Sequence, residues 1–245
     1  MNSTLADYYK NPKLKELVLK GVEYSSGKIG RTSAGVPVFE CHDIKVPPPE
    51  IFALQQIETL RFEFCKSLDL GATLTSLVEL PALRRLEFKN CEISRIAPEI
   101  GALQKLTHLS FSVDAYRFTY NEFSDFPPEI GELVNLQELD LCDNRDFVRF
   151  PAEVSKLRSL KYINLRGLPT LPENIELIPN LKWLRLYQSR ITPAQIEPLV
   201  AKPNGLESVT VNDYYYRSFS EIAGKYPNFN VSTEAEGSTM RGNYL

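Results

Sequence analysis

The sequence contains few of the residues on which catalytic and metal-binding sites depend. Its 245 residues include two histidines, two methionines and one tryptophan. Four cysteines are present, Cys41, Cys65, Cys91 and Cys142, but neither a CxxC pair nor another metal-ligand spacing joins them. No glycine-rich phosphate loop and no nucleophile–base motif occurs. The sequence therefore predicts no cofactor, no metal and no enzymatic activity.

An excess of one charge and a long hydrophobic run are also absent. Twenty-eight basic residues stand against 31 acidic ones, which leaves a net charge of -3 and no positive field for a polyanion. We therefore expect no nucleic-acid partner. No segment approaches the 18 apolar residues of a membrane-spanning helix. The first 13 residues lack the apolar core of a secretory signal. We expect no membrane association and a cytoplasmic location.

What the sequence does contain is a repeated apolar pattern. An apolar residue, two others, an apolar residue, one other and a third apolar residue recur six times, and Leu206 opens a seventh copy. The six copies are Ile57-Leu60-Phe62, Leu83-Leu86-Phe88, Leu106-Leu109-Phe111, Leu136-Leu139-Leu141, Leu160-Ile163-Leu165 and Leu181-Leu184-Leu186. Their first residues lie 21 to 30 positions apart. Such a period indicates stacked units, each of which buries its apolar face on its neighbours.

A second pattern follows most copies of the first, with proline, then isoleucine or valine, then leucine. Examples are Pro48-Pro-Glu-Ile51-Phe-Ala-Leu54, Pro151-Ala-Glu-Val154-Ser-Lys-Leu157 and Pro193-Ala-Gln-Ile196-Glu-Pro-Leu199. From about Leu14 to Tyr214 the chain resembles the leucine-rich repeat, in the intracellular-type form of about 23 residues with a Pro-x-x-Ile-x-x-Leu outer segment.

The resemblance implies an α/β repeat fold, a leucine-rich repeat solenoid. In that family parallel β-strands line the concave face of a curved horseshoe, and helical or 3₁₀ turns line its convex face. Proline suits the first turn of such a helix, because its missing amide hydrogen has no partner there. Cys65 and Cys91 occupy the ninth position of their repeats, where the family usually has Asn or Cys, so we expect them to be buried.

We expect a single domain with four parts. These are residues 1–56, an N-terminal cap and irregular first repeats; 57–213, the leucine-rich repeats; 214–231, a C-terminal cap; and 232–245, a flexible tail. The cap should contain one short helix around Phe219 to Gly224. Solenoids need such atypical end units because the terminal apolar faces would otherwise be exposed.

The segment 112–126 exceeds a standard repeat by about seven residues and carries five aromatic side chains. Phe126 precedes a proline and should fill the core. The other aromatic residues either pack onto adjacent repeats or lie at the rim of a partner site. The sequence leaves these alternatives open.

Side chains at the third, fifth and seventh positions of each repeat should share the concave face. In the first repeats Arg61 lies beside Glu87, and Glu63 beside Lys89, which predicts a self-neutralising ladder of charges. The C-terminal half instead carries tyrosine, arginine and the only tryptophan, the types that dominate binding energy at interfaces. The predicted partner-binding residues are Glu138, Asp140, Tyr162, Asn164, Arg166, Trp183, Arg185 and Tyr187, with Tyr116 and Phe118 from the long segment.

His108 lies in the same array beside Glu138. Because no nucleophile or second histidine accompanies this pair, we expect a polar surface column and not an acid–base pair. The sequence thus favours a non-catalytic protein–protein interaction module that binds an unknown protein or peptide on its concave face. The alternatives are a self-associating structural protein, with Tyr214–Tyr216 as the contact surface, and a regulatory part of an enzyme complex. We expect a monomer or a weak homodimer.

Overall fold

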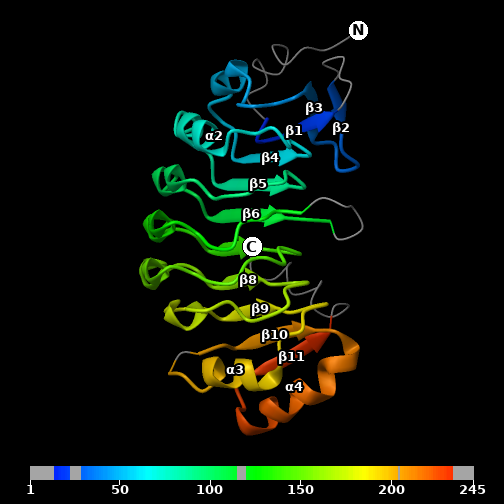
Figure 1. Ribbon diagram of the computed structural model, residues 1–245, viewed down its shortest axis with the longest axis vertical. Coiled ribbons are helices and arrows are strands. Elements are labelled where there is room, and N and C mark those ends of the chain that lie inside the picture. The colour runs from blue at the N-terminus through cyan, green and yellow to red at the C-terminus, as the bar shows by residue number, and fades with distance from the viewer. Residues whose placement is uncertain (1–13, 23–28, 115–119, 204, 234–245) are drawn as a thin grey trace.

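The computed structural model describes residues 14–22, 29–114, 120–203 and 205–233. Tyr116 and Phe118, two of the predicted partner-binding residues, lie outside these ranges. The described residues form one long sheet with helical turns stacked beside it (Figure 1).

The sheet has eleven strands in the order β11-β10-β9-β8-β7-β6-β5-β4-β1-β3-β2. They are β1 Glu16–Val22, β2 Ile29–Arg31, β3 Pro37–His42, β4 Thr59–Glu63, β5 Arg85–Lys89, β6 His108–Ser112, β7 Glu138–Asp140, β8 Tyr162–Asn164, β9 Trp183–Arg185, β10 Ser208–Val211 and β11 Asn230–Thr233. All neighbouring pairs are parallel except β2 with β3. Parallel strands need a crossover, and the helical turns supply it.

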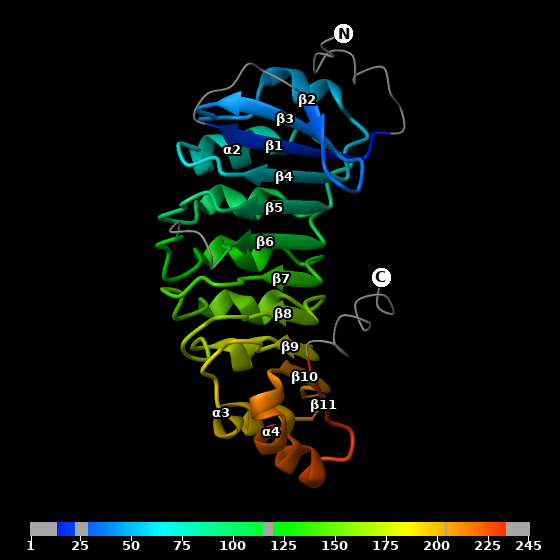
Figure 2. The ribbon, with the colours of Figure 1, turned by 90° about the vertical axis from the view of Figure 1, so that its right-hand side faces the viewer.

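The helical turns lie on the side of the stack opposite the exposed face of the strands (Figure 2). They are η1 Pro49–Ala53, α2 Leu70–Leu77, η2 Pro98–Ala102, η3 Pro128–Glu132, η4 Ala152–Lys156, η5 Ile175–Leu177 and α3 Pro193–Val200. Helix α4, Asp213–Lys225, instead lies at the C-terminal end of the stack (Figure 1). Proline opens η2, η3 and α3, as the sequence predicts. We call the exposed face of the strands the sheet face and the opposite side the turn side. The predicted solenoid is confirmed.

Each repeat, with its strand and its turn, forms one rung of the stack. Apolar side chains from successive rungs fill the space between the sheet face and the turn side. Leu184 and Leu186 are 1% and 2% exposed, so the repeated leucines point inward as the pattern predicts. Phenylalanine rings continue the stack, with the centroids of Phe62 and Phe88 5.2 Å apart. Phe126 is 3% exposed within this row, which confirms its predicted place in the core. Each such buried ring contributes about 1.5–3 kcal/mol.

The N-terminal strands do not stack in sequence order. β1 pairs with β4 on one side and with β3 on the other. The chain reverses between β2 and β3 in a turn where the amide of Thr32 donates to the carbonyl of Val36. Gly35 supplies a φ of +82° in this turn. The resulting antiparallel hairpin adds to the outer edge of β1 and forms the end of the sheet.

The C-terminal end is more ordered than the sequence predicts. Helix α4 spans 13 residues, whereas the prediction was a short helix around Phe219 to Gly224. Strand β11 continues to Thr233, so the predicted start of a flexible tail at residue 232 is wrong. The side chain of Ser232 is 3% exposed, and its hydroxyl lies 3.1 Å from that of Thr210. Pairing with β10 is what extends the sheet over this polar segment.

Candidate functional site

Strands β7, β8 and β9 bring most of the predicted partner-binding residues together on the sheet face. Their register aligns Glu138, Tyr162 and Trp183 in one row. A second row aligns Asp140, Asn164 and Arg185. We name the partly exposed members of this cluster the β7–β9 patch: Glu138, Asp140, Tyr162, Arg166, Trp183, Arg185 and Tyr187.

Asn164 is a correction to the predicted site, because its side chain is only 2% exposed. Its Nδ2 donates to Oδ1 of Asp140 at 2.9 Å, and its Oδ1 accepts the amide of Arg166 at 3.1 Å. Asp140 accepts the amide of Cys142 at 2.9 Å in the same way. Side chains of this type bond to the backbone two residues on and so end the strand in a turn. Asn164 therefore positions the patch and offers little surface to a partner.

The guanidinium of Arg166 is held in place by two neighbours from the next rung. Its Nε and Nη2 donate to Oε1 of Gln188 at 3.0 and 2.8 Å. Its Cζ lies 5.5 Å from the ring centroid of Tyr187, a cation–π contact. Within the described ranges the structure shows no carboxylate paired with Arg166. The positive charge is oriented but not neutralised.

Gln188 is a site residue that the sequence analysis missed. Its backbone is left-handed, with a φ of 57°, and its amide donates to Oδ1 of Asn212 at 2.5 Å. Arg145 was missed as well; its Cζ lies 5.9 Å from the ring of Tyr120, which is 42% exposed. Both residues follow strands in turns, where the alternation used for prediction no longer applies. Gln188 lies two residues after its apolar triplet, and the equivalent positions Phe64, Asn90, Asp143 and Gly167 also have a positive φ.

The acidic members of the patch already have partners inside the protein. Oε2 of Glu138 lies 3.2 Å from Nε2 of His108, as the columns predict. Nδ1 of His108 lies 2.8 Å from the hydroxyl of Thr107, whereas Nε2 is near the Glu138 carboxylate without forming a hydrogen bond to it. Among the described residues no group of three His, Cys, Asp or Glu side chains could hold a metal ion. This geometry matches the expected polar column.

The first rungs show part of the predicted ladder of opposite charges. Arg61 pairs with Glu87, whereas Glu63 and Lys89 lie in register on neighbouring strands but form no ion pair within the described ranges. Nε of Arg61 lies 2.5 Å from Oε2 of Glu87, and Nη1 of Arg61 lies 3.7 Å from Oε1 of Glu63. Arg85 also approaches Glu87, at 3.8 Å. Burial opposes the charge of Arg61, but the hydrogen bond and the charge of Glu87 outweigh it and raise the pKa of Arg61. The two arginines in this part of the sheet face are thus paired with carboxylates of the same chain.

The described cysteines are unsuited to act as nucleophiles. Cys65, Cys91 and Cys142 are free and buried, which confirms the expectation for the first two. Burial, together with the charges of Asp140 and Asp143, raises the pKa of the Cys142 thiol. A hydrogen bond with Cys91, followed by burial, raises the pKa of the Cys65 thiol. A protonated, buried thiol is a poor nucleophile.

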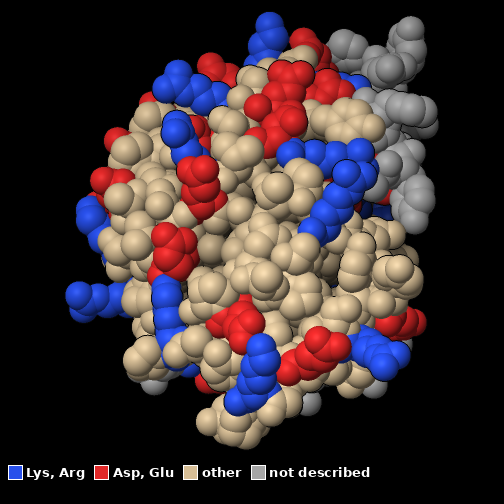
Figure 3. All heavy atoms as spheres, turned by 60° about the horizontal axis from the view of Figure 1, so that its bottom comes forward, with Lys and Arg blue, Asp and Glu red and all other residues tan. Residues whose placement is uncertain are grey.

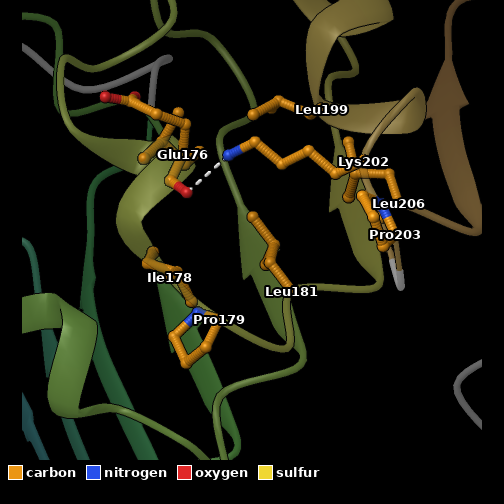
Figure 4. Close-up of a pocket in the computed structure, with 10 residues that line it drawn as sticks. Glu176, Ile178, Pro179, Leu181, Leu199, Lys202, Pro203 and Leu206 are labelled. Carbon is orange, nitrogen blue, oxygen red and sulfur yellow. Dashed lines mark hydrogen bonds between the residues drawn. The ribbon is translucent and has the colours of Figure 1, made fainter.

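A small hollow lies on the turn side, between η5 and α3 (Figure 4). Ile178, Pro179, Leu181 and Leu199 give it mostly apolar walls. Lys202 extends across it, and its Nζ donates to the backbone carbonyl of Glu176 at 2.6 Å. The hollow is remote from the sheet face, and its lysine is bonded to the wall of the hollow.

The parallel sheet and its row of helical turns match solved structures. The structure of the Leptospira interrogans LRR protein LIC12759 aligns with a TM-score of 0.59 and 21% identity, over 94% of this chain and 57% of that one. The protein has the leucine-rich repeat fold. The LRIM1/APL1C complex aligns with a TM-score of 0.49 and 15% identity, over 80% of this chain and 34% of that one. No protein-family model matches the sequence.

This leucine-rich repeat chain spans 57% of the length of the Leptospira protein. Solenoids of this class typically serve as protein-interaction modules, since stacked repeats create an extended surface. None of the helices in the described part of the chain is both long and apolar enough to span a membrane.

Proposed function

We propose that the protein is a non-catalytic interaction module that binds a protein or peptide partner through the β7–β9 patch. The patch lies within residues 57–213, which we take as the repeat array of a single domain. We further propose a cytoplasmic location, where the buried free thiols would stay reduced.

The contrast between the two halves of the sheet face carries this proposal. In the first rungs each arginine of the ladder lies within 4 Å of a carboxylate, and ion pairs of that kind are largely solvated surface. In the β7–β9 patch, Arg166 instead lies over the ring of Tyr187 and forms no ion pair with a carboxylate among the described residues. Tyr162 and Trp183 lie side by side next to it.

The residue types of the patch suit a binding surface. Tryptophan, tyrosine and arginine are enriched among the few side chains that carry most interface binding energy. Tyr187 and Gln188 orient Arg166 before any partner arrives, so binding loses less side-chain entropy. The arginine offers a carboxylate-bearing partner a charge-assisted hydrogen bond.

The experiment is affinity capture from a native cell extract, followed by calorimetry with the captured partner. Trp183→Ala combined with Arg185→Ala should weaken binding by at least about 2 kcal/mol, or roughly 30-fold in Kd, because two anchor side chains are lost. Circular dichroism should show an unchanged fold.

The matched control removes one arginine and one apolar side chain from the turn side. Arg158→Ala combined with Leu177→Ala alters two exposed residues, the leucine being 38% exposed. This variant should bind as tightly as the wild type. Equal affinity of the Trp183/Arg185 variant and the wild type would show that the partner binds elsewhere.

A further inference from the structure

Helix α4 has an outward face that the packing of the solenoid does not use. Its inward face buries Phe219 and Ile222 against the last rungs. The six outward residues are all exposed: Asp213, Tyr214, Arg217, Glu221, Gly224 and Lys225. At about 100° per residue they fall within one arc of about 120°. Basic and acidic side chains are interspersed among uncharged ones over this end of the molecule (Figure 3).

The signs of the charges along this face alternate, so the order read from one end is opposite to the order read from the other end. Acidic and basic residues alternate every fourth position, as Asp213, Arg217, Glu221 and Lys225. If a second α4 lies antiparallel, with the two helices crossing at the level of Phe219, Asp213 lies level with Lys225 of the second copy. Arg217 then faces Glu221 of the second copy. Two-fold symmetry produces each of these attractive pairs twice.

The sizes of the side chains match in the same alignment. Tyr214 is 87% exposed, and the antiparallel arrangement places its ring over Gly224 of the second copy. A Cβ added to Gly224 would meet no atom of the described residues within 4 Å, so no neighbour among them requires glycine there. Glycine weakens a helix interior, but it leaves room for an aromatic ring from outside.

The outward charges are available for such a contact. Within the described ranges, the structure shows no ion pair for Asp213, Arg217 or Glu221. Lys225 places its Nζ 2.9 Å from Oε1 of Glu197. An ammonium group has three donors, so Lys225 can keep this bond and donate another to a second carboxylate.

We propose that the outward face of α4 is a homodimer contact, in which two α4 helices pack antiparallel about a two-fold axis. Such a contact is isologous and closes on itself, so it produces a dimer and not a filament. The helix is about 18 Å long, from 12 rises of about 1.5 Å. Two faces of this size bury less area than a stable dimer usually needs, so the dimer is weak and concentration-dependent. High salt weakens it further.

Sedimentation equilibrium at protein concentrations up to about 1 mM tests the proposal. Wild type should dimerise progressively and less at high salt. Arg217→Glu alone and Glu221→Arg alone should each raise the dimer Kd at least tenfold, because each places like charges opposite each other. Combining the two substitutions restores opposite charges, and the Kd should return to within about threefold of wild type. Arg158→Glu, the same charge reversal on the turn side, should leave the Kd unchanged.

Gly224→Leu separates loss of the contact from loss of the fold. Leucine is the better helix former, so the melting temperature measured at dilute concentration should stay the same or rise. The added side chain fills the space under Tyr214 of the second copy, and the Kd should rise at least tenfold. A wild type that stays monomeric at every concentration would overturn the proposal. So would a double charge variant whose dimer Kd is as high as those of the single variants.

Discussion

At the scale of single residues, the side-chain amides of Asn121 and Asn144 are buried in an otherwise largely apolar interior. Asn144 is 1% exposed and donates through Nδ2 to the backbone carbonyl of Phe111. Its Oδ1 accepts Nδ2 of Asn121 at 2.8 Å, and Oδ1 of Asn121 accepts the amide of Ile93 at 2.8 Å. The pair thus connects successive rungs where the long segment ends. These two buried amides are tolerated because each makes hydrogen bonds through both its nitrogen and its oxygen.

Replacing Asn144 with alanine should be strongly destabilising. The change removes the partners of the Phe111 carbonyl and of the Asn121 amide, and each buried unsatisfied group costs about 1–3 kcal/mol. We expect the free energy of unfolding to fall by about 3 kcal/mol in urea denaturation. Asn135→Ala is the control, since that exposed amide makes one bond, to the carbonyl of Gln104 at 2.9 Å. A loss no larger than that of the control would contradict the assigned role.

Individual residues also show where prediction from the sequence stops. The alternation of side chains correctly placed Tyr162, Trp183 and Arg185 together on the sheet face. It failed at Asn164, which shares their alternation but turns its amide back to Asp140 and to the amide of Arg166. That choice depends on where the strand ends, and a three-residue strand ends almost as soon as it begins.

At the scale of elements, the turns on the turn side pack closely enough to require glycine. A Cβ on Gly131, in η3, would lie 2.6 Å from the carbonyl oxygen of Glu153, in η4. A Cβ on Gly101, in η2, would likewise lie 2.8 Å from the carbonyl oxygen of Glu129, in η3. Because backbone atoms cannot easily move aside, these two glycines set the spacing of three consecutive turns.

Gly131→Ala should therefore destabilise the protein, although alanine is ordinarily the better helix former. We expect a loss of about 1–3 kcal/mol from overpacking, measured by urea denaturation at dilute concentration. Gly224→Ala is the matched control, because its added methyl group meets no atom within 4 Å in the part of the chain that the structure describes. That variant should be as stable as the wild type, or more stable by up to about 1 kcal/mol. Equal effects of the two substitutions would exclude the proposed close approach.

The repeated strands and turns were predictable because each one carries its own apolar triplet and proline. Helix α4 was predicted too short, since Tyr214 and its neighbours remain exposed and add no apolar periodicity to its first turns. Strand β11 was not predicted at all. It contains Asn230, Ser232 and Thr233, and only its pairing with β10 makes this segment a strand.

At the scale of the whole molecule, the C-terminal end protects the last apolar rung from water. Phe219 is 1% exposed and anchors α4 against the core. In a solenoid each rung contacts only its neighbours, so damage at one end need not spread along the array.

Phe219→Ala should therefore loosen the C-terminal end selectively. The lost ring costs about 3–5 kcal/mol, most of it local to the last rungs. In native-state hydrogen exchange the amides of β10 and β11 should exchange at least about tenfold faster, whereas those of β4 and β5 should change by less than about twofold. Uniform acceleration along the chain would show that the solenoid unfolds as one cooperative unit.

The sequence by itself determined the rung period, the inward leucines and the leucine-rich repeat fold, because these depend on contacts between neighbouring copies of one pattern. The tertiary structure alone decided that β1 lies between β3 and β4, that Asn164 is buried, and that α4 presents a charged outward face. Each of these depends on how segments without the pattern meet the array. Their partners are set by hydrogen bonds and free strand edges, which local periodicity does not encode.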